Sequence, residues 1–372
     1  MTRNRLREGF TTGTAATAAA MGALERLISG RGPREVDVPL PREGRRVIPV
    51  ERTTARNDGA EALVVKDGGD DPDATHRARI RAIVRLLPEG GPTRVTIRGG
   101  TGVGRVTRPG LPVPVGDPAI NPAPRLQIEA GVREVLARTG REGGVVVTIE
   151  VEDGERIARR TLNPRLGIQG GISILGTRGT VKPFSNQAYR DTITMSMDVA
   201  GSIGLETVAL ATGGKSERLL RELRPDLPDP AWIQVADFFA FSLEAASARG
   251  FDTVLYACFF GKLVKMAQGH PYTHARKSRI DFRELASWCA SAGMDPEGAL
   301  AVGRANTSRE ALEVIRDSPE GDRILEDAVA RAVVTARRFL AREVALVYHL
   351  FDFDERLLKT RAHPPTARRE TP

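Results

Sequence analysis

The chain has 372 residues, of which 41% are hydrophobic and 27% charged, and its formal net charge at pH 7 is +8. This length predicts two domains with a substantial core, and no apolar run approaches the roughly 18 residues of a membrane span. The two cysteines form no Cys-x-x-Cys pair, which argues against a disulfide framework or zinc site and for reduced thiols in the cytoplasm. Basic residues are spread along the chain and aromatic residues make up only 5%, so the composition does not indicate a nucleic-acid-binding protein.

The first half alternates Val and Thr with Gly and Pro, a pattern typical of short strands joined by turns. An Ala-rich stretch at 14–23 and a stretch at 123–138, after a Pro-rich loop, predict helices. Because strands and helices mix without a regular repeat, residues 1–195 are expected to form an α+β domain. The predicted strands span residues 36–38, 47–50, 62–66, 94–97 and 145–151.

The second half changes to short apolar strands that alternate with helices. This predicts a smaller, Rossmann-like α/β domain with a parallel sheet over 196–355, a boundary between 190 and 205, and a disordered tail over 356–372. Ligands of such sheets bind at the carboxyl ends of strands, here the loops 211–215, 236–238 and 258–262. The predicted strands are 208–211, 232–235, 253–257 and 344–350, the helices are 216–223, 238–249 and 261–267, and 281–342 is mostly helical.

The densest motif is the Gly/Ser/Thr run at 161–185, TLNPRLGIQGGISILGTRGTVKPFS. Five of its glycines fall within thirteen residues. Such glycines allow close backbone approach or a positive φ, and the hydroxyl and N–H groups of loops like this bind anions. The competing interpretation is a set of tight turns between strands.

Two other runs lie nearer the N-terminus. In REGFTTGT, at 7–14, threonines stand at the start of the Ala-rich helix, where they either cap it or help it to bind an anionic group. In VKDGGDDPDATH, at 65–76, four acids either bind a divalent metal or cap a helix starting near Thr75. Because the spacing matches an EF-hand poorly, no metal site is assigned.

The run GGTGVGRVT at 99–107 follows a predicted strand but precedes no predicted helix, so it does not indicate nucleotide binding. The prolines between 109 and 122 instead predict an extended loop that forms a wall of a site. The five histidines are scattered, and the sequence contains no Ser–His–Asp arrangement or nucleophile elbow. These observations favour ligand binding by loops without a covalent protein nucleophile.

Four of these runs together resemble the cobalt-precorrin-5B C1-methyltransferase (CbiD) family of anaerobic cobalamin biosynthesis. They are TTGT, VKDxGDDPDxTH, PAINP at 118–122, and GGISILGT through KPFS, in the family's order, covering about residues 5–200 with weaker similarity to about 310. The resemblance implies methyl transfer from S-adenosyl-L-methionine to ring carbon C1 of cobalt-precorrin-5B, giving cobalt-precorrin-6A. It implies an anionic corrinoid partner that carries the cobalt itself and no nucleic-acid or membrane partner, and it leaves a homo-oligomer open.

The resemblance also implies site residues, although it assigns no catalytic residue. The acidic arms of a corrinoid require hydroxyl, amide, Arg and Lys groups. The residues implied in substrate binding are Thr11, Thr12, Gly13, Thr14, Asp70, Asp71, His76, Asn121, Asn163, Arg165, Gly170, Gly171, Ser173, Gly176, Thr177 and Lys182. The residues implied in methyl-donor binding are Thr212, Gly213, Gly261, Lys262, Thr273 and His274.

The chain departs from the family pattern at four places. The family's Cys after Thr-Gly-Thr is Ala15, and its Pro-Gly loop reads Thr212-Gly213. Its Gly-His-x-Gly-Lys segment is CFFGK at 258–262, and its Asn-Thr-His-Ser segment is YTHA at 272–275. These differences leave open a diverged, non-catalytic corrinoid-binding relative. A third possibility, an enzyme with a phosphate-bearing ligand, depends on TGGKS at 212–216, which matches only the end of a P-loop.

Overall fold

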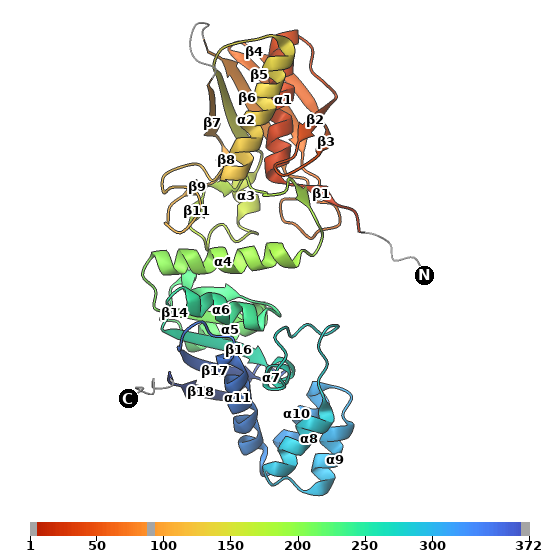
Figure 1. Ribbon diagram of the computed structural model, residues 1–372, viewed down its shortest axis with the longest axis vertical. Helices are drawn as coiled ribbons and strands as arrows, with labels where there is room; N and C mark the ends of the chain where they lie inside the picture. The colour runs from red at the N-terminus through yellow and green to blue at the C-terminus, as the bar shows by residue number, and fades with distance from the viewer. Residues whose placement is uncertain (1–5, 88–93, 366–372) are drawn as a thin grey trace, which may run out of the picture. The chain divides into compact units, whose positions relative to one another are not determined.

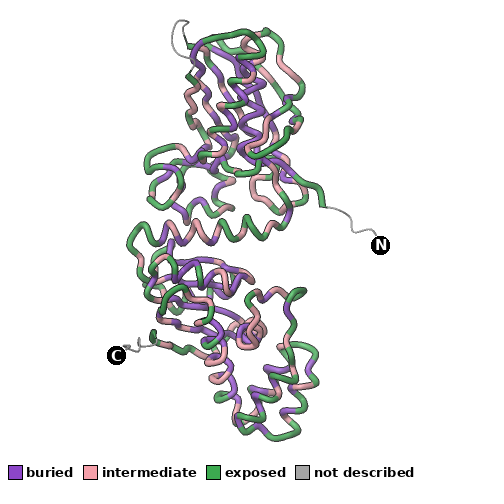
Figure 2. The backbone as a smooth tube through the Cα atoms, in the orientation of Figure 1, coloured by how far each residue is buried: buried purple, intermediate pink, exposed green. Residues whose placement is uncertain are grey.

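The computed structural model describes residues 6–87 and 94–365, which fall into two compact units divided between Asn186 and Gln187 (Figure 1). Each unit has its own sheet and its own core of buried side chains (Figure 2). No helix in the described part of the chain is long and apolar enough to cross a membrane. The fold is therefore mixed α/β, with several sheets that include parallel strands.

A five-stranded sheet forms the body of unit 1, the part that ends at Asn186. Its order is β4-β5-β6-β10-β7, and all neighbours are antiparallel except β10 and β7. Helix α1 lies against β5, β6 and helix α2, and Figure 1 shows both helices running along the sheet. The bounds are α1 (Thr12–Ser29), β4 (Arg52–Arg56), β5 (Gly59–Val65), β6 (Arg79–Leu86), β7 (Val95–Gly99), α2 (Pro122–Thr139) and β10 (Val145–Val151).

Both helices predicted for this unit are confirmed, and local sequence explains their ends. Helix α1 follows its N-cap, Thr11, and stops at Gly30, whose φ of 73° only glycine adopts readily. Helix α2 begins with Pro122 and also ends at a left-handed glycine, Gly140. The alanines of α1 are fully buried, because small side chains let the helix backbone approach the sheet closely.

Residues 79–86 form strand β6, so the expectation of a helix starting near Thr75 is wrong. Ile80, Ala82 and Val84 are fully buried and alternate with more exposed neighbours, which is the period of a strand. Strand β6 pairs with β5 on one side and β10 on the other. The basic residues between the buried positions hid this alternation. Strand β4 was not predicted either.

Within the described residues, four two-stranded sheets join segments of unit 1. The Gly-rich run contributes one strand to three of them, so it is tied by backbone pairing to the segments at 9–10 and 102–106. The pairs are β1 (Gly9–Phe10) with β13 (Thr180–Val181), β8 (Gly102–Val103) with β12 (Gly171–Ile172), β9 (Arg105–Val106) with β11 (Ile168–Gln169), and the hairpin β2 (Glu35–Pro39) with β3 (Arg45–Pro49). The short helix α3 spans Gly154–Ala158.

Unit 2 is built on a sheet of order β15-β14-β16-β17-β18. The first four strands are parallel and β18 is antiparallel to β17. Strands β15 and β16 lie on opposite sides of β14, so the direction in which the sheet grows reverses there. The four strands predicted for this half are confirmed as β14 (Thr207–Ala211), β15 (Trp232–Gln234), β16 (Thr253–Phe259) and β17 (Ala345–Phe351).

Helices supply most of the core of unit 2 (Figure 2). Tyr256 and Tyr348 are fully buried in this core and stack with ring centroids 5.4 Å apart. The helices are α4 (Asn186–Ser202), α5 (Gly214–Leu223), α6 (Phe239–Ala248), α7 (Phe260–Ala267), α8 (Phe282–Ser291), α9 (Pro296–Arg304), α10 (Ser308–Asp317) and α11 (Gly321–Arg337), with a 3₁₀ turn at Asp229–Ala231.

Two boundaries differ from the expectation. Helix α4 runs across 195/196, and its buried Ile193 and Met197 belong to the core of unit 2, so the division falls earlier and the second unit is not the smaller one. Residues 357–363 form strand β18 instead of a tail, because the edge of β17 offers backbone groups that β18 satisfies. Residues 366–372 of the expected tail lie outside the described residues.

Candidate functional site

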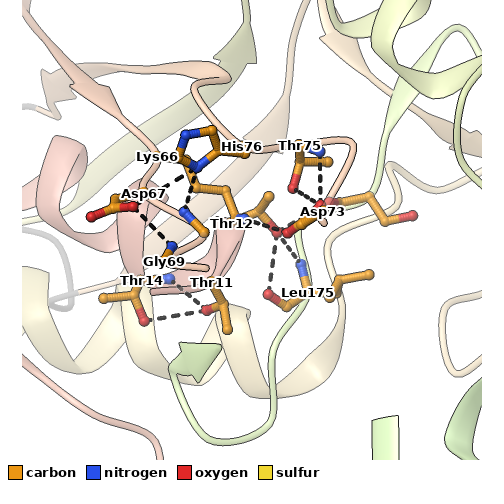
Figure 3. A network of polar contacts seen from close by, with 12 residues as sticks. Thr11, Thr12, Thr14, Lys66, Asp67, Gly69, Asp73, Thr75, His76 and Leu175 are labelled. Carbon is orange, nitrogen blue, oxygen red and sulfur yellow. Dashed lines mark hydrogen bonds and ion pairs between the residues drawn. The ribbon is translucent and has the colours of Figure 1, made fainter. Parts of the chain in front are cut away.

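The threonines of the first motif lie where helix α1 begins, facing the Gly-rich run (Figure 3). The Thr12 hydroxyl lies 3.2 Å from the carbonyl oxygens of Ser173 and Leu175, to which it donates, and accepts the Leu175 N–H at 2.9 Å. Thr11 caps the helix by accepting the Thr14 N–H at 3.2 Å. These side chains are buried, so their hydroxyls point into the protein and hold the Gly-rich run against the start of α1.

A second set of hydrogen bonds within unit 1 also holds the Gly-rich run in place. The Asn163 amide donates to the carbonyl oxygen of Gly171 at 3.1 Å and accepts from the Ser173 hydroxyl at 3.2 Å. Gln127 of α2 donates to the Thr14 hydroxyl at 3.1 Å, and that hydroxyl donates to the main chain of the run at Gly179, 2.8 Å away. Gln127 was not predicted, since its partner lies on another helix and nothing near it in the sequence marks it.

Close packing explains most of the predicted glycines. A Cβ on Gly171 would lie 2.1 Å from the carbonyl oxygen of Gly102, and one on Gly176 would lie 2.4 Å from the Cβ of Thr11. A Cβ on Gly13 would lie 2.8 Å from the Pro124 ring. The motifs thus approach each other where only glycine fits. Gly170, in contrast, has a φ of 77° and nothing within 4 Å of an added Cβ.

The acidic run is used in ion pairs and turns. Asp67 pairs with Arg7, whose hydrogen bond is the main cause that lowers the pKa of Asp67 to about 2. The His76 Nδ1 accepts the Gly68 N–H at 3.0 Å and lies 3.8 Å from Asp67. Among residues 6–87 and 94–365, no group of three or more His, Cys, Asp or Glu side chains is arranged to hold a metal ion.

A buried lysine that sequence reasoning missed joins this run. Lys66 is 1% exposed, and its ammonium lies 2.5 Å from a carboxylate oxygen of Asp73 (Figure 3). Burial alone would raise the pKa of Asp73, but the charge and hydrogen bond of Lys66, with hydrogen bonds from Thr75, lower it. The pair holds the turn after β5. The feature of the sequence that could have indicated this pair is a lysine at the end of an apolar strand, followed by acidic residues.

The remaining predicted substrate residues lie at least partly at the surface. The Asp70 carboxylate accepts the Arg7 N–H at 2.6 Å, and Asp71 accepts the Phe184 N–H at 2.9 Å. Thr177 and Lys182 are at least partly exposed on the Gly-rich run itself. The full surface set is Asp70, Asp71, His76, Asn121, Arg165, Gly170, Thr177 and Lys182.

In unit 2, Lys262 connects the loops that follow three parallel strands. Its ammonium donates to the carbonyl oxygens of Thr212 at 3.1 Å and Ala236 at 2.9 Å, and lies 3.2 Å from the Asp237 carboxylate. Ala236 has a φ of 48°, an uncommon conformation for a residue with a side chain. The expected loops 211–215, 236–238 and 258–262 therefore meet at one ammonium group.

Asp237 is the central acid of this site, and only its loop was predicted. The Thr273 hydroxyl donates to its Oδ1 at 3.2 Å, the same oxygen that faces Lys262, and Oδ2 has no partner within the described residues. Lys265, also missed, donates to the Thr273 carbonyl oxygen at 3.0 Å. Burial lowers the pKa of Lys265, the Asp237 carboxylate opposes this shift, and the nearby charge of Lys262 adds to it. The position of Asp237, two residues after the predicted strand at 232–235, was the usable indication.

The other predicted residues of this unit are less central. His274 stacks on Tyr272 with ring centroids 5.9 Å apart. Gly213 is extended, with a φ of 165°, and its carbonyl oxygen accepts the buried Ser216 hydroxyl at 3.0 Å. Lys215 points to Glu355, 3.1 Å away. The P-loop-like segment 212–216 thus directs its hydroxyl and ammonium groups to protein partners, which leaves the phosphate interpretation without support.

A cavity of about 570 Å³ opens beside Lys262, between the beginnings of α7 and α10. We call it the α7–α10 cavity. Gly261 lines it, and a Cβ there would lie 2.5 Å from the Ser308 hydroxyl of α10. Of the predicted residues, only Gly261 and Lys262 reach it. The full lining is Lys215, Phe259, Gly261, Lys262, Lys265, Ala275, Ser278, Arg279, Ile280, Phe282, Asn306, Thr307, Ser308 and Phe353.

The cysteines do not act as nucleophiles. Burial raises the pKa of Cys258 to about 12 and that of Cys289 to about 11, so both stay protonated thiols at neutral pH. The arrangement is suited to holding ligands by hydrogen bonds and charge.

Two family models match the chain, one described as CbiD over residues 1–183 and one as CbiD, C-terminal domain over residues 272–362. The second reaches beyond residue 310, where similarity was expected to end. A cobalt-precorrin-5B C(1)-methyltransferase from Nitratidesulfovibrio vulgaris is 51% identical over 94% of this chain and 91% of its own length. One of the same name from Salinispora arenicola is 44% identical over 94% and 90%.

A crystal structure of the cobalamin biosynthesis protein cbiD from Archaeoglobus fulgidus is 29% identical to the chain. The match covers 69% of this chain and 78% of that one, with a TM-score of 0.39.

Proposed function

The chain belongs to the CbiD family, and from that premise we propose that it transfers a methyl group from S-adenosyl-L-methionine to C1 of cobalt-precorrin-5B, yielding cobalt-precorrin-6A. The observation that carries the proposal is the 51% identity, over 94% of the chain, to a relative that bears this activity in its name. The protonated thiols of Cys258 and Cys289 agree with it, since a sulfonium methyl group needs no covalent protein nucleophile.

The strand-end site of unit 2 fits the methyl donor, which supplies an activated methyl group on a sulfonium sulfur. The open Oδ2 of Asp237 can accept hydrogen bonds from ribose hydroxyls, as the acid after the second strand does in dinucleotide-binding α/β folds. Lys262 and Thr273 hold that carboxylate in place. We place the methyl donor against Asp237, Thr212, Gly213, Lys262, Thr273 and His274, with Gly261 at the margin.

The strand order of unit 2 supports this placement. A Rossmann-like interpretation takes β14, β15 and β16 as the first three strands, with the order reversing between β14 and β16. Ligands of such folds bind at the carboxyl ends of strands on either side of that reversal. Thr212 follows β14 and Lys262 lies just beyond the end of β16, so both are at the favoured point.

For the corrinoid, the residues of unit 1 divide into two roles. Gly170, Thr177 and Lys182, which lie at the surface, are proposed to meet the acidic arms, together with Arg165, Asn121, His76, Asp70 and Asp71. The buried Thr11, Thr12, Thr14, Asn163 and Ser173, with Gly13, Gly171 and Gly176, are proposed to position that surface without touching the substrate.

The test is incubation of the purified chain with cobalt-precorrin-5B and S-adenosylmethionine carrying a labelled methyl group. The expected result is a corrinoid that gains one labelled methyl at C1, located by NMR, with equal release of S-adenosylhomocysteine. Corrinoid binding without methyl gain would instead identify a carrier. Binding of neither compound would contradict both. The buried free thiols Cys258 and Cys289 support a cytoplasmic location for this chemistry.

A further inference from the structure

The α7–α10 cavity carries an excess of positive charge. Lys215, Lys262, Lys265 and Arg279 line it, and within the described residues no Asp or Glu does. Lys215 pairs with Glu355, and Lys262 pairs with Asp237. Both carboxylates lie outside the lining. Lys265 donates to a carbonyl oxygen and is attracted by the Asp237 carboxylate, whereas the exposed Arg279 guanidinium has no hydrogen bond or ion pair in the described part of the chain. The lining therefore has one cation, Arg279, without a protein partner, and its three lysines share two acids, Asp237 and Glu355, that lie outside the lining.

Two helix beginnings add to this field. Helix α7 starts at Phe260 and α10 at Ser308, and Gly261 and Ser308 both line the cavity. Their close approach requires the glycine, since a Cβ at 261 would lie 2.5 Å from the Ser308 hydroxyl. The first turn of a helix has N–H groups without intrahelical acceptors and attracts anions. These two helix beginnings and the Arg279 guanidinium act on the same space, and the α10 end is in part satisfied already by its cap Thr307 and by Glu310 in its first turn.

Aromatic rings form another wall of the cavity. Phe259 and Phe353 stack with ring centroids 6.3 Å apart, and Phe282 also lines the space. The Arg309 guanidinium lies 5.1 Å from the centroid of Phe353. A flat organic anion gains contact area from such a wall, whereas inorganic phosphate gains none. The geometry thus combines oxyanion recognition with an apolar surface.

We propose that the α7–α10 cavity binds the carboxylate arms at one edge of the tetrapyrrole substrate, with Arg279 and Lys265 as their partners. The methyl donor carries a sulfonium, an ammonium and one carboxylate group, so its net charge is positive and it suits this basic lining less well than a polycarboxylate does; we place it on the Asp237 side of Lys262. The identity of the anion rests on the proposed function, whereas carboxylate binding by the cavity does not. Gly261, which lies at the margin of the methyl-donor site, is then part of the substrate-binding cavity.

The experiment titrates the full chain with coproporphyrin III, a tetracarboxylate porphyrin, followed by porphyrin absorbance, and with its tetramethyl ester. Arg279→Gln should weaken coproporphyrin binding about tenfold, the loss expected for one charge-assisted contact. Lys265→Gln should weaken it similarly. The control is Arg276→Gln, whose exposed side chain lies on the same loop without lining the cavity and should leave the affinity unchanged. The ester should bind far more weakly than the acid.

Three outcomes would overturn the proposal: equal affinity of Arg279→Gln and the parent chain, competitive displacement of coproporphyrin by S-adenosylhomocysteine, or displacement by inorganic phosphate at similar concentration. The methyl-transfer assay is scored separately. Methyl transfer by the parent chain with no effect of Arg279→Gln on porphyrin binding contradicts the cavity assignment alone. Loss of porphyrin binding in Arg279→Gln without methyl transfer by the parent chain contradicts the proposed function alone.

Discussion

In unit 1, Thr12 is 2% exposed and its hydroxyl bonds to the main chain of the same unit, whereas in unit 2 Asp237 uses one carboxylate oxygen and leaves the other open within the described residues. The Gly-rich run is the denser motif, yet its best-defined hydroxyls hold one segment of the protein against another. The loops of unit 2 have a sparser pattern and leave some groups without a protein partner, such as the Arg279 guanidinium in the segment between α7 and α8. A dense motif can therefore encode internal fit, so the density of a motif alone does not locate a ligand site.

Gly171→Ala is expected to have the largest effect on stability, and it tests how closely the Gly-rich run packs within unit 1. The new Cβ would lie 2.1 Å from the Gly102 carbonyl oxygen, a backbone atom that cannot turn aside. Unit 1 should lose about 3 kcal/mol or more of unfolding free energy. Hydrogen exchange of unit 1 peptides measures this, because Trp232, Trp288 and all four tyrosines lie in unit 2 and report only on that unit.

Gly170→Ala is the matched control for that change. Gly170 has positive φ but open space around an added Cβ, so the cost should be about 1 kcal/mol, from backbone strain alone. Equal exchange in the two variants would mean that the run is not tightly packed, and the contrast between the units would fail.

The next largest expected effect is a difference between the two units in how their stability changes as the pH falls. Burial lowers the pKa of His349 in unit 2 from 6.5 to about 4, and its Nε2 has no hydrogen-bond partner among the described residues. The unfolded chain therefore binds the proton first, and unit 2 loses stability as the pH falls from 6.5 to 4. The loss is at most about 3 kcal/mol, because a difference of one in pKa corresponds to about 1.36 kcal/mol. Urea unfolding followed by tryptophan fluorescence at pH 7 and pH 5 measures it.

Unit 1 should respond only at lower pH. Asp67, whose pKa is lowered from 3.8 to about 2, contributes stability that is present above pH 4 and disappears as the pH falls through 2. His349→Gln should flatten the change in unit 2 between pH 7 and pH 5. Earlier acid weakening of unit 1 than of unit 2, seen by hydrogen exchange, is the result that would contradict this order.

Thr12→Val is expected to lower the stability of unit 1 by an intermediate amount. It removes the hydroxyl that bonds Ser173 and Leu175 and leaves the Leu175 N–H without its partner. Unit 1 should lose about 2 kcal/mol, while Thr177→Val, nearer the surface, should change stability by less than about 0.5 kcal/mol. Unchanged hydrogen exchange together with weaker coproporphyrin binding would show that the Thr12 hydroxyl contacts ligand, against the positioning role.

The smallest effect on folding, but a clear one on binding, is expected from Asp237→Asn. The amide oxygen can still accept from Thr273 and face the Lys262 ammonium, so unit 2 should lose only the charge of a partly exposed ion pair, about 1 kcal/mol or less. Affinity for S-adenosylhomocysteine, measured by calorimetry, should fall about tenfold, because ribose hydroxyls lose a charged acceptor. Asp226→Asn, at an exposed ion pair with Arg224, is the control. Full affinity in Asp237→Asn would remove this residue from the methyl-donor site.

Local patterns were sufficient for several elements and insufficient for others. The strand at 145–151 and the helix at 123–138 were predicted, because burial of one face imposes a visible period and Pro122 and Gly140 mark the helix ends. Strand β6 was missed because basic residues occupy its other face. Gln127 and Asp237 were missed as site residues since each acts through a partner far along the chain, Thr14 or Thr273.

By itself, the sequence determined which family the chain belongs to and which loops end the parallel strands, because both depend on residue order and local backbone preference. Tertiary structure alone decided which polar groups are bonded within the protein. Whether a threonine faces a ligand or a neighbouring carbonyl oxygen depends on what the fold brings within about 3 Å of it, and no spacing records that. For the same reason the Thr12 hydroxyl is used in bonds within the protein, whereas the Arg279 guanidinium lines a cavity.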